Sequence, residues 1–401
     1  MAIENKRAAG IKSSPSMAIA MAARKLAAHG RDIIDLSLGE PDFEPPPHVA
    51  EAACAAIRKG RVRYGAAAGT EELRQAVVDK FRRENQLDYG LEEVMVANGA
   101  KQILFDVFLA TLEPGDEVII PTPCWVSYGD IVALHGGTPV YVTCGREIGF
   151  KITPEKLEAS ITPKTRWLML NSPSNPTGAI YSQEEYRALG QVLARHCQIL
   201  VISDEIYEHI LLTDVAFISF AKACAGLRHR TLIVNGVSKA YAMTGWRVGY
   251  AAGPKALIAA LNKMQSQSVT SVSTVAQAAA LAALTGDQSF VGNAAAIFTA
   301  RSKIMADNLA GIDGIDFTPP EGAFYAFVGI ERLLGRKTAA GEVITDDTVF
   351  ASHLLNEFGL SGVPGVAFGT PGFIRLSIAA SDRELEGACE RLAAMVHSLG
   401  L

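Results

Sequence analysis

The sequence lacks the patterns that mark metal-binding and disulfide-linked proteins. Its six cysteines are scattered without a C-x-x-C pair, and its eight histidines form no H-x-x-x-H pattern. Neither a zinc site nor a disulfide framework is therefore indicated. The cysteines are typical of small buried residues in a reducing compartment, and we expect no bound metal.

Long apolar runs and an excess of one charge are also missing. Residues 1–30 are charged from the start and lack the apolar core of a signal peptide. The run VAQAAALAAL is interrupted by Gln277 and is too short to span a bilayer. A net charge of −5 over 401 residues gives no general attraction to nucleic acid or to an anionic membrane. We therefore expect a cytoplasmic protein that binds neither.

Apolar sequence is what the chain does have. Hydrophobic residues make up 49% and charged residues 20%, which supports large buried cores, and the length favours two domains. Short β-branched runs alternate with helix-like segments, and several runs are apolar throughout, as strands buried on both faces are. This alternation predicts an α/β fold with a mostly parallel, doubly wound sheet. The runs are 93–99, 116–122, 139–144, 166–173, 198–205, 231–237 and 248–253.

Helix start signals support this interpretation. The segment 69–85 has Thr70 as an expected N-cap, followed by two glutamates in the positive first turn. The segment 182–196 opens with Ser182-Gln-Glu-Glu, which fits a capping box.

The chain changes character near residue 290, where a long helix-like run is followed by two strand-like segments. We expect a large domain at 46–290. A smaller α+β domain is expected from 291–401, joined by the leading residues 1–45, which cross over to it.

Unusual residues follow several of the expected strands, where ligands bind in such sheets. Asp204 ends an apolar run, and burying it unpaired would cost roughly several kcal/mol, so it either meets a cation or caps a helix. Asn171 and Asn175 lie in LNSPSNPTG, which would also make a good turn. Gly99-Ala100 opens a helix whose free N–H groups could bind an anion.

The stretch SKAYAMTGWR, residues 238–247, holds two cations and no acid. Its Lys239 is either a lysine that snorkels to solvent or one that loses its proton to do chemistry. Arg375, inside the strand-like FIRLS, favours a carboxylate ligand or a structural ion pair. Trp125 could stack on a flat ring or fill the core, and Tyr64 could be a surface aromatic.

Together these residues fit a flat cationic heteroaromatic that needs an acid at its ring nitrogen, a donor at its phenolic oxygen, a stacking plate, a phosphate site and a lysine for its aldehyde. That describes pyridoxal phosphate. The ordered motifs Y-x-x-x-x-G, N-G-A-K, P-x-W, N-x-P-x-N-P-T-G, S-D-E-I-Y, S-K-x-x-x-M-T-G-W-R and F-I-R-L-S resemble those of the class I aminotransferases of pyridoxal-phosphate fold type I. The resemblance covers nearly the whole chain and is greatest to the bacterial aspartate aminotransferase branch that includes enzymes accepting prephenate.

The resemblance implies a role for each matching residue. Lys239 matches the Schiff-base lysine, which then moves the proton of the substrate Cα. Asp204 matches the acid that keeps the pyridine nitrogen protonated. Asn175 and Tyr207 match the donors to the ring oxygen. Trp125 matches the stacking plate beside the ring and substrate.

Phosphate and substrate contacts are implied in the same way. Arg375 matches the clamp for the substrate α-carboxylate, helped by Gly39 and Asn175. Lys12 matches a lysine that contacts the distal carboxylate of a dicarboxylic substrate, or is a solvated lysine. Tyr64 matches a tyrosine that reaches the phosphate of a neighbouring subunit, which implies a homodimer. The matches to the phosphate site are Gly99, Ala100, Lys101, Ser238 and Arg247.

Three positions depart from the family pattern. Gly236 stands where a serine commonly contacts the phosphate, so we expect that contact to be absent. Cys124 replaces a frequent tyrosine and is expected to alter the pocket wall. The loop at 127–131 lacks the usual proline. These differences leave the substrate range open.

We therefore expect a pyridoxal-phosphate-dependent aminotransferase acting on aspartate and 2-oxoglutarate, with an aromatic amino acid or prephenate as the alternative substrate. A C–S β-lyase on the same fold would use the same cofactor residues. A non-catalytic effector-sensing domain is a third reading. The chain begins almost directly with the family pattern and has no basic helix-turn-helix segment, which argues against that reading.

Overall fold

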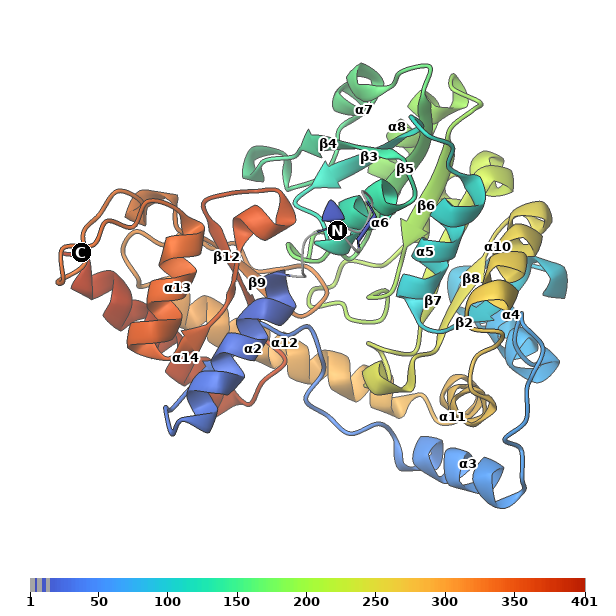
Figure 1. Cartoon of the computed structure of the whole chain (residues 1–401), viewed down its shortest axis with the longest axis horizontal. Helices are drawn as coiled ribbons and strands as arrows, with labels where there is room; N and C mark the ends of the chain where they lie inside the picture. Colours follow the sequence, from blue (N-terminus) through green and yellow to red (C-terminus); the bar gives the residue numbers. More distant parts are fainter. Residues whose placement is uncertain (1–3, 6–8, 12–14, 401) are drawn as a thin grey trace.

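The structure is a computed structural model that describes residues 4–5, 9–11 and 15–400 (Figure 1). Its largest sheet has one strand at each of the seven expected runs. These strands are β2 (Val94–Ala97), β3 (Glu117–Thr122), β4 (Thr138–Thr143), β5 (Thr165–Asn171), β6 (Leu200–Asp204), β7 (Thr231–Gly236) and β8 (Gly249–Ala252). Their order across the sheet is β2-β8-β7-β6-β5-β3-β4. Strands β3 to β7 are parallel, whereas β8 is antiparallel to both β7 and β2, so the prediction of a mostly parallel sheet is confirmed.

Helices cover both faces of this sheet, as the continuous apolar runs require. They are α3 (Pro47–Arg58), α4 (Glu71–Asn85), α5 (Ala100–Thr111), α6 (Ser127–Leu134), α7 (Pro154–Ser160), α8 (Gln183–Ala194), α9 (Phe220–Ala223), α10 (Lys255–Ser268) and α11 (Thr274–Thr285). Along β5, Trp167 and Met169 join the core under α5 and α10, while Leu168 and Leu170 join the core under α8. Successive side chains point to opposite faces of a strand, so a strand covered on both faces is apolar at every position.

Both expected helix starts are present. The hydroxyl oxygen of Thr70 accepts a hydrogen bond from the N–H of Leu73, at 3.3 Å, at the start of α4. At the start of α8, Ser182 and Glu185 exchange bonds of 3.2 and 2.7 Å, which is the predicted capping box.

The remaining elements form a second group at the opposite side of the molecule from α10 (Figure 1). Its helices are α2 (Pro15–Ala28), α12 (Ser289–Leu309), α13 (Asp347–Phe358) and α14 (Asp382–Ser398). Its strands are β1 (Ile34–Asp35), β9 (Tyr325–Gly329), β10 (Leu360–Ser361), β11 (Val363–Pro364) and β12 (Phe373–Ser377). They form a three-stranded sheet, β11-β12-β9, and a two-stranded one in which the early β1 pairs with the late β10. The expected domain division near residues 46 and 290 stays a prediction.

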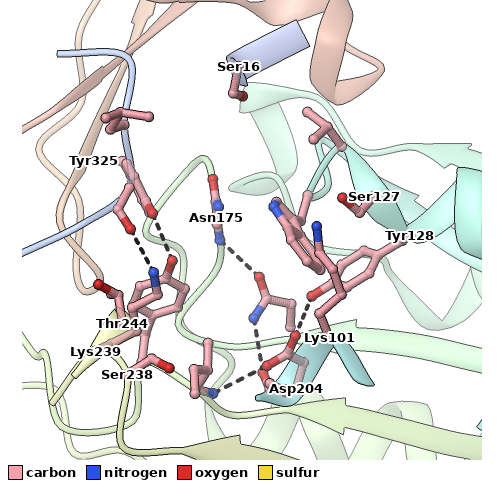
Figure 2. A pocket seen from close by; sticks show the side chains of 18 of the residues that line it. Ser16, Lys101, Ser127, Tyr128, Asn175, Asp204, Ser238, Lys239, Thr244 and Tyr325 are labelled. Atoms are coloured by element: carbon pink, nitrogen blue, oxygen red, sulfur yellow. Dashed lines mark hydrogen bonds between the residues drawn. The ribbon is translucent and has the colours of Figure 1, made fainter. Parts of the chain in front are cut away.

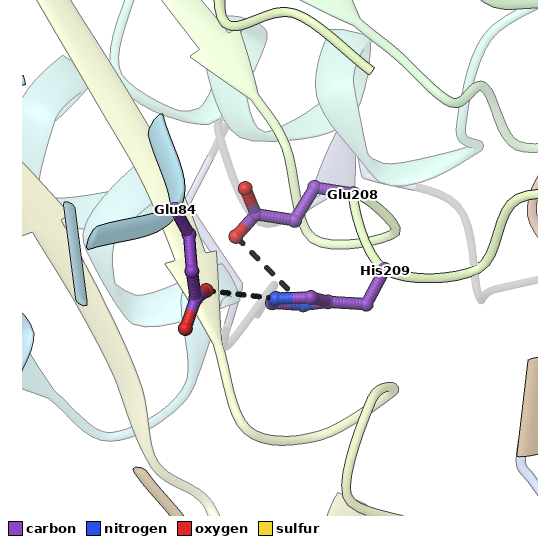
Figure 3. A group of neighbouring side chains, drawn as sticks. All are labelled: Glu84, Glu208 and His209. Atoms are coloured by element: carbon purple, nitrogen blue, oxygen red, sulfur yellow. Dashed lines mark hydrogen bonds and ion pairs between the residues drawn. The ribbon is translucent and has the colours of Figure 1, made fainter. Parts of the chain in front are cut away.

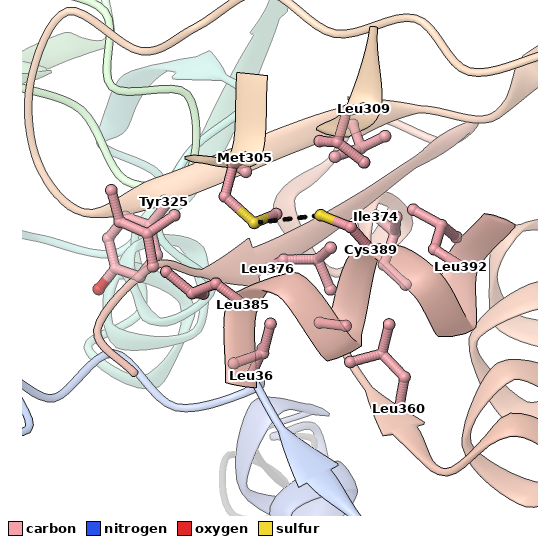
Figure 4. Packing of buried hydrophobic residues seen from close by; sticks show 14 of the residues in the cluster. Leu36, Met305, Leu309, Tyr325, Leu360, Ile374, Leu376, Leu385, Cys389 and Leu392 are labelled. Carbon is pink, nitrogen blue, oxygen red and sulfur yellow. Dashed lines mark hydrogen bonds between the residues drawn. The ribbon is translucent and has the colours of Figure 1, made fainter. Parts of the chain in front are cut away.

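The core of this second group lies between α12, α14 and the strands. Figure 4 shows Met305 of α12 and Cys389 of α14 meeting at its centre, with their sulfur atoms 3.6 Å apart. Leu36, from the early part of the chain, packs into the same cluster as Leu376 of β12. Burial of each such side chain stabilises the fold by about 1.5–3 kcal/mol. The segment that follows Leu36 is thereby anchored where it reaches the large sheet.

Across the described part of the chain, no helix combines the length and the apolar character needed to cross a membrane.

Candidate active site

A cavity of about 390 Å³ lies at the carboxyl ends of β5 and β6, between the large sheet and the second group of elements. The register of these strands places Asn171 directly beside Asp204. Residues from α2, α5, α6, β9 and β12 complete the walls, and Figure 2 shows several of them pointing into the space. The predicted site residues that line it are Gly39, Ala100, Lys101, Trp125, Asn175, Asp204, Tyr207, Ser238, Lys239, Arg247 and Arg375.

Lys239 lies in this cavity with its ammonium group withdrawn from solvent. Its Nζ donates a hydrogen bond of 2.6 Å to the carbonyl oxygen of Gly39 and lies 5.8 Å from the ring centre of Tyr207. Burial lowers the pKa of Lys239 to about 8, and although Glu40 opposes this, Arg375 adds to it. About a tenth of the amine is therefore neutral, and able to attack a carbonyl carbon, at pH 7.

Asp204 is the buried carboxylate at the end of β6. Tyr128 donates its hydroxyl to Oδ2 at 2.7 Å, and the N–H of Ile206 donates to Oδ1 at 3.3 Å. Burial raises the pKa of Asp204 to about 6, although these bonds and Lys239 lower it in part. Because Asp204 lines the cavity, this acid is suited to receive a proton or a cationic N–H from a bound ring.

Arg375 of β12 is buried and only partly partnered. Its Nη1 donates to Oδ1 of Asn175 at 3.0 Å and its Nη2 donates to the carbonyl oxygen of Ser37 at 2.6 Å. The Nε atom has no hydrogen-bond partner, and no carboxylate pairs with the guanidinium in the described chain. A buried cation paired only with neutral oxygens is suited to a carboxylate ligand.

The N-terminus of α5 and Arg247 meet at one end of the cavity. Gly99 precedes the helix with φ of 86°, and a Cβ on it would lie 2.4 Å from Nη2 of Arg247. A Cβ on Gly249 would lie 2.4 Å from the backbone nitrogen of Ala100, so glycine permits this close packing. Free helix N–H groups beside a guanidinium make a site suited to an anion.

Lys101, on the first turn of α5, brings a second cation to the cavity. Its Nζ lies 4.6 Å from the ring centre of Trp125, and it forms no ion pair within the described residues. Burial and Arg247 lower its pKa. The family resemblance implies a role for Lys101 only at the phosphate site, so its ammonium group over the ring of Trp125 is a feature that the structure adds.

Three predicted residues are not placed among the residues that line the cavity. Gly99 lies behind it and contacts Arg247 as described. Tyr64 is 90% exposed and does not line the cavity of its own chain. Lys12 lies outside the described residues. The roles assigned to the site residues stay predictions, although most of these residues do come together.

Sequence reasoning missed two tyrosines that hold predicted residues. Tyr128 bonds Asp204, and the hydroxyls of Tyr325 and Tyr207 are 2.7 Å apart. The sequence did offer one signal, because Tyr128 stands three residues after Trp125, a spacing that brings side chains together on a helix. In the structure the two rings pack edge to face. The expectation of a loop at 127–131 was wrong, because these residues form the first turns of α6.

The structure explains one departure from the family pattern and locates another. A Cβ at Gly236 would lie 2.9 Å from the carbonyl oxygen of Val248, so glycine lets β7 and β8 approach. Cys124 is buried behind Tyr128 and does not line the main cavity. Burial raises the pKa of its thiol to about 12, which makes it an inert packing residue.

Behind the cavity, Glu84, Glu208 and His209 form a cluster of metal-ligand types, and Figure 3 shows the His209 ring between the two carboxylates. A cation already occupies this cluster, because Lys80 contacts Glu208 directly and lies 3.5 Å from Glu84. The carboxylate of Glu208 also accepts hydrogen bonds from Asn85 and Asn235. These contacts explain the cluster without a metal ion.

The chain is similar to known proteins over almost all of its length. Residues 31–392 match the family model described as aminotransferase class I and II. The aspartate/prephenate aminotransferase of Cereibacter sphaeroides is 49% identical over 399 residues, covering 100% of both chains. The crystal structure of the aspartate aminotransferase from Rhizobium meliloti has a TM-score of 0.96 at 47% identity, covering 99% of this chain and 100% of that one. The aspartate aminotransferase from Thermus thermophilus with maleate has a TM-score of 0.92 at 41% identity, covering 98% and 100%.

The chain therefore belongs to the aminotransferase class I and II family, and its fold is that of pyridoxal-phosphate fold type I. It is an aminotransferase, so the predicted family, fold and enzyme class are confirmed.

Proposed function

We propose that the protein binds pyridoxal phosphate through Lys239 and transfers the amino group of aspartate to 2-oxoglutarate. The observation that carries the proposal is that one cavity is lined both by a buried lysine, whose pKa is lowered to about 8, and by the buried acid Asp204. The residues fit the cofactor: the helix N-terminus and Arg247 suit its phosphate, and Trp125, which packs against the Asp204 partner Tyr128, offers an aromatic ring in the same cavity.

When bound, pyridoxal phosphate withdraws electrons from the substrate Cα, so that the proton on that carbon becomes acidic. Lys239 holds the cofactor through its Nζ and then carries the proton between Cα and the carbonyl-derived carbon. Asp204, oriented by Tyr128, keeps a proton on the ring nitrogen. Tyr207 and Asn175 donate hydrogen bonds to the ring oxygen.

The substrate class follows from two of the four cations that line the cavity, Arg375 and Lys101. Arg375, whose guanidinium has an unpartnered Nε, binds the α-carboxylate with two parallel hydrogen bonds. Lys101 supplies a second positive charge for a distal carboxylate. The names of the Rhizobium and Thermus relatives support aspartate, and the Thermus structure was determined with maleate, a four-carbon dicarboxylate.

This proposal is tested by mixing the purified protein with pyridoxal phosphate and single amino acids, and following conversion of the cofactor to its amino form. Aspartate and glutamate should convert it at least about tenfold faster than alanine, since an added charge contact contributes about 1.4 kcal/mol or more. Equal rates for all amino acids would contradict the substrate assignment. Pyruvate and ammonia formed without an oxo-acid acceptor would instead indicate C–S or other lyase chemistry.

Mutation can show whether Lys12 or Lys101 contacts the distal carboxylate of the substrate. If Lys101 is the contact, Lys101→Ala should raise the KM for aspartate about tenfold and leave that for alanine nearly unchanged. Lys12→Ala serves as the comparison, because its assignment rests on the family resemblance alone. The variant that affects aspartate selectively identifies the contact, and equal effects on both amino acids would exclude it.

Prephenate is a second candidate substrate, because the Cereibacter relative, which matches the whole chain, is named an aspartate/prephenate aminotransferase. Prephenate also carries two carboxylates, so Arg375 and a second cation would serve it in the same way. Product formation from prephenate with aspartate as donor tests this directly, and no turnover at millimolar prephenate would exclude it.

We also propose that two copies of the chain share their sites through Tyr64. Its 90% exposure supports a role outside its own subunit. A dimer by light scattering, together with weaker cofactor binding in Tyr64→Phe, is the expected result. A monomer with full cofactor affinity would contradict it.

A further inference from the structure

The turn that follows β6 has two faces. Asp204 and Tyr207 point into the cavity, whereas Glu205 and Glu208 are buried on the side away from it. Three carboxylates within five residues are thus taken out of water, which requires partners on both faces. The cavity face was described above, and on the other face the partners of Glu208 come from distant elements.

Glu208 is held by side chains from two of those elements. From α4, Lys80 contacts Oε1 and Asn85 donates to Oε2 at 2.7 Å. From β7, Asn235 donates to Oε1 at 2.6 Å. All four side chains are buried, with Lys80 fully inaccessible to solvent.

The side chains that hold Glu208 also make hydrogen bonds to other groups. Lys80 also donates to Oδ1 of Asn85 at 2.8 Å, and Oδ1 of Asn235 accepts the N–H of Gly236 at 2.7 Å. The pKa of Glu208 is lowered even though burial acts to raise it, because Lys80, the adjacent His209 and the hydrogen bonds favour the carboxylate. A buried, fully satisfied network of this kind specifies one arrangement of the segments that it joins.

The segments joined are those that carry the predicted catalytic groups. Glu208 is bonded to Tyr207 through the chain, and Asn235 stands four residues before Lys239 on the same run of chain. The Tyr207 hydroxyl also lies 2.7 Å from the hydroxyl of Tyr325, and its ring packs against Phe324. A shift of the Glu208 side chain would therefore move the Tyr207 hydroxyl relative to Lys239.

We propose that Glu208 is a positioning residue, whose carboxylate, held by Lys80, Asn85 and Asn235, ties the Asp204–Tyr207 turn to the Lys239 segment and sets where the Tyr207 hydroxyl meets the cofactor. The proposal rests on the proposed binding of pyridoxal phosphate. A side chain outside the cavity would thus set the hydrogen bond that Tyr207 donates to the ring oxygen of the cofactor inside the cavity.

The test is the pH dependence of the absorbance of bound pyridoxal phosphate in Glu208→Gln. A displaced hydroxyl donor leaves more negative charge on the ring oxygen, which holds the neighbouring proton more tightly. The pH midpoint of the absorbance change should therefore be higher in Glu208→Gln than in the unaltered protein, by about half to one unit. A folded, cofactor-binding variant with the midpoint of the unaltered protein would overturn the proposal.

A second variant separates positioning from loss of stability. Lys80→Met combined with Glu208→Gln removes both buried charges, so its thermal midpoint should recover relative to Glu208→Gln alone. The absorbance midpoint should stay shifted, because the hydrogen bonds of the carboxylate are still absent. Recovery of both together would show that the network acts only on stability, and would overturn the proposal.

The matched control is Arg230→Lys. Arg230 is a buried cation at the opposite end of β7, where it donates to three backbone carbonyl oxygens. Its loss should lower the thermal midpoint without moving the absorbance midpoint. If the unaltered protein shows no absorbance change with pyridoxal phosphate, the proposed function fails, whereas an unshifted Glu208→Gln beside a normal unaltered protein refutes only the positioning role.

Discussion

The cavity and the Glu208 network hold charged groups at similar depth but partner them in opposite ways. In the cavity, the pKa values of Lys239 and Asp204 are shifted toward the neutral forms, to about 8 and about 6. In the network, the pKa of Glu208 is lowered, so its charge is kept. A buried charged group that still lacks hydrogen-bond partners marks a place for a ligand. A buried charged group whose hydrogen bonds are all made marks a part of the scaffold.

The largest effect should follow from removing the amine of the cavity. Lys239→Ala should lower kcat for transamination by at least about 10³-fold, because both the attachment point and the proton carrier are lost. The steady-state rate with aspartate and 2-oxoglutarate measures this. Residual activity within tenfold of the unaltered protein would place the chemistry elsewhere.

Arg375 should rank next. Arg375→Lys keeps a positive charge but loses the two-pronged geometry, so kcat/KM for aspartate should fall about 100-fold, equivalent to about 2.7 kcal/mol. Arg301→Lys is a suitable comparison, because Arg301 pairs with Asp42 outside the cavity through two bonds of 2.7 Å. An equal loss in both variants would mean that the Arg375 effect is general destabilisation.

The comparison of the two regions can be sharpened by stability measurements without cofactor. Asp204 is charged and poorly compensated at pH 7, so Asp204→Asn should raise the free energy of unfolding by about 1–2 kcal/mol. Because the folded pKa is raised to about 6, this penalty is absent below the unfolded pKa near 4 and grows as pH rises from about 4 to 6. The gain should therefore shrink at pH 5.

The network should show the opposite sign. Glu208→Gln should lower the free energy of unfolding by about 3 kcal/mol at pH 7, because Lys80 loses its main counter-charge. The folded pKa of Glu208 is lowered, so its contribution is present above the unfolded value and is lost as pH falls toward the folded value. Chemical denaturation of Asp204→Asn and Glu208→Gln at two pH values measures both changes in the free energy of unfolding. Changes of the same sign in the two variants would contradict the distinction between the cavity and the network.

Tyr128 should give the smallest effect. Its hydroxyl stabilises the carboxylate form of Asp204, so Tyr128→Phe should raise the Asp204 pKa further. Cofactor affinity should then begin to fall at a pH higher by about half a unit to one unit. Titration of affinity against pH, with Tyr141→Phe as an exposed control, measures the shift, and superimposed curves would exclude this role.

The sequence predicted the large sheet well because its strands, such as 166–173, are apolar on both faces and each is closed by a recognisable turn. Several cavity residues, such as Asn175, Asp204 and Lys239, were predictable because each ends or follows a strand that ends at the same edge of the large sheet. It could not predict the contact of Tyr207 with Tyr325, which lies 118 residues away, or the burial of Lys80, which has the sequence pattern of a surface lysine. Such contacts depend on packing between distant elements, and no local pattern reports them. Cytoplasmic location and pairing of subunits stay predictions.

The central claim is that Lys239 is the residue that binds the aldehyde of pyridoxal phosphate. The most direct measurement is to incubate the protein with pyridoxal phosphate, reduce it with borohydride, digest it and locate the added mass by mass spectrometry. The account predicts a single pyridoxyl group on Lys239, absent when aspartate has first converted the cofactor to its amino form. A label on Lys101 or another lysine, or no label at all, would contradict it.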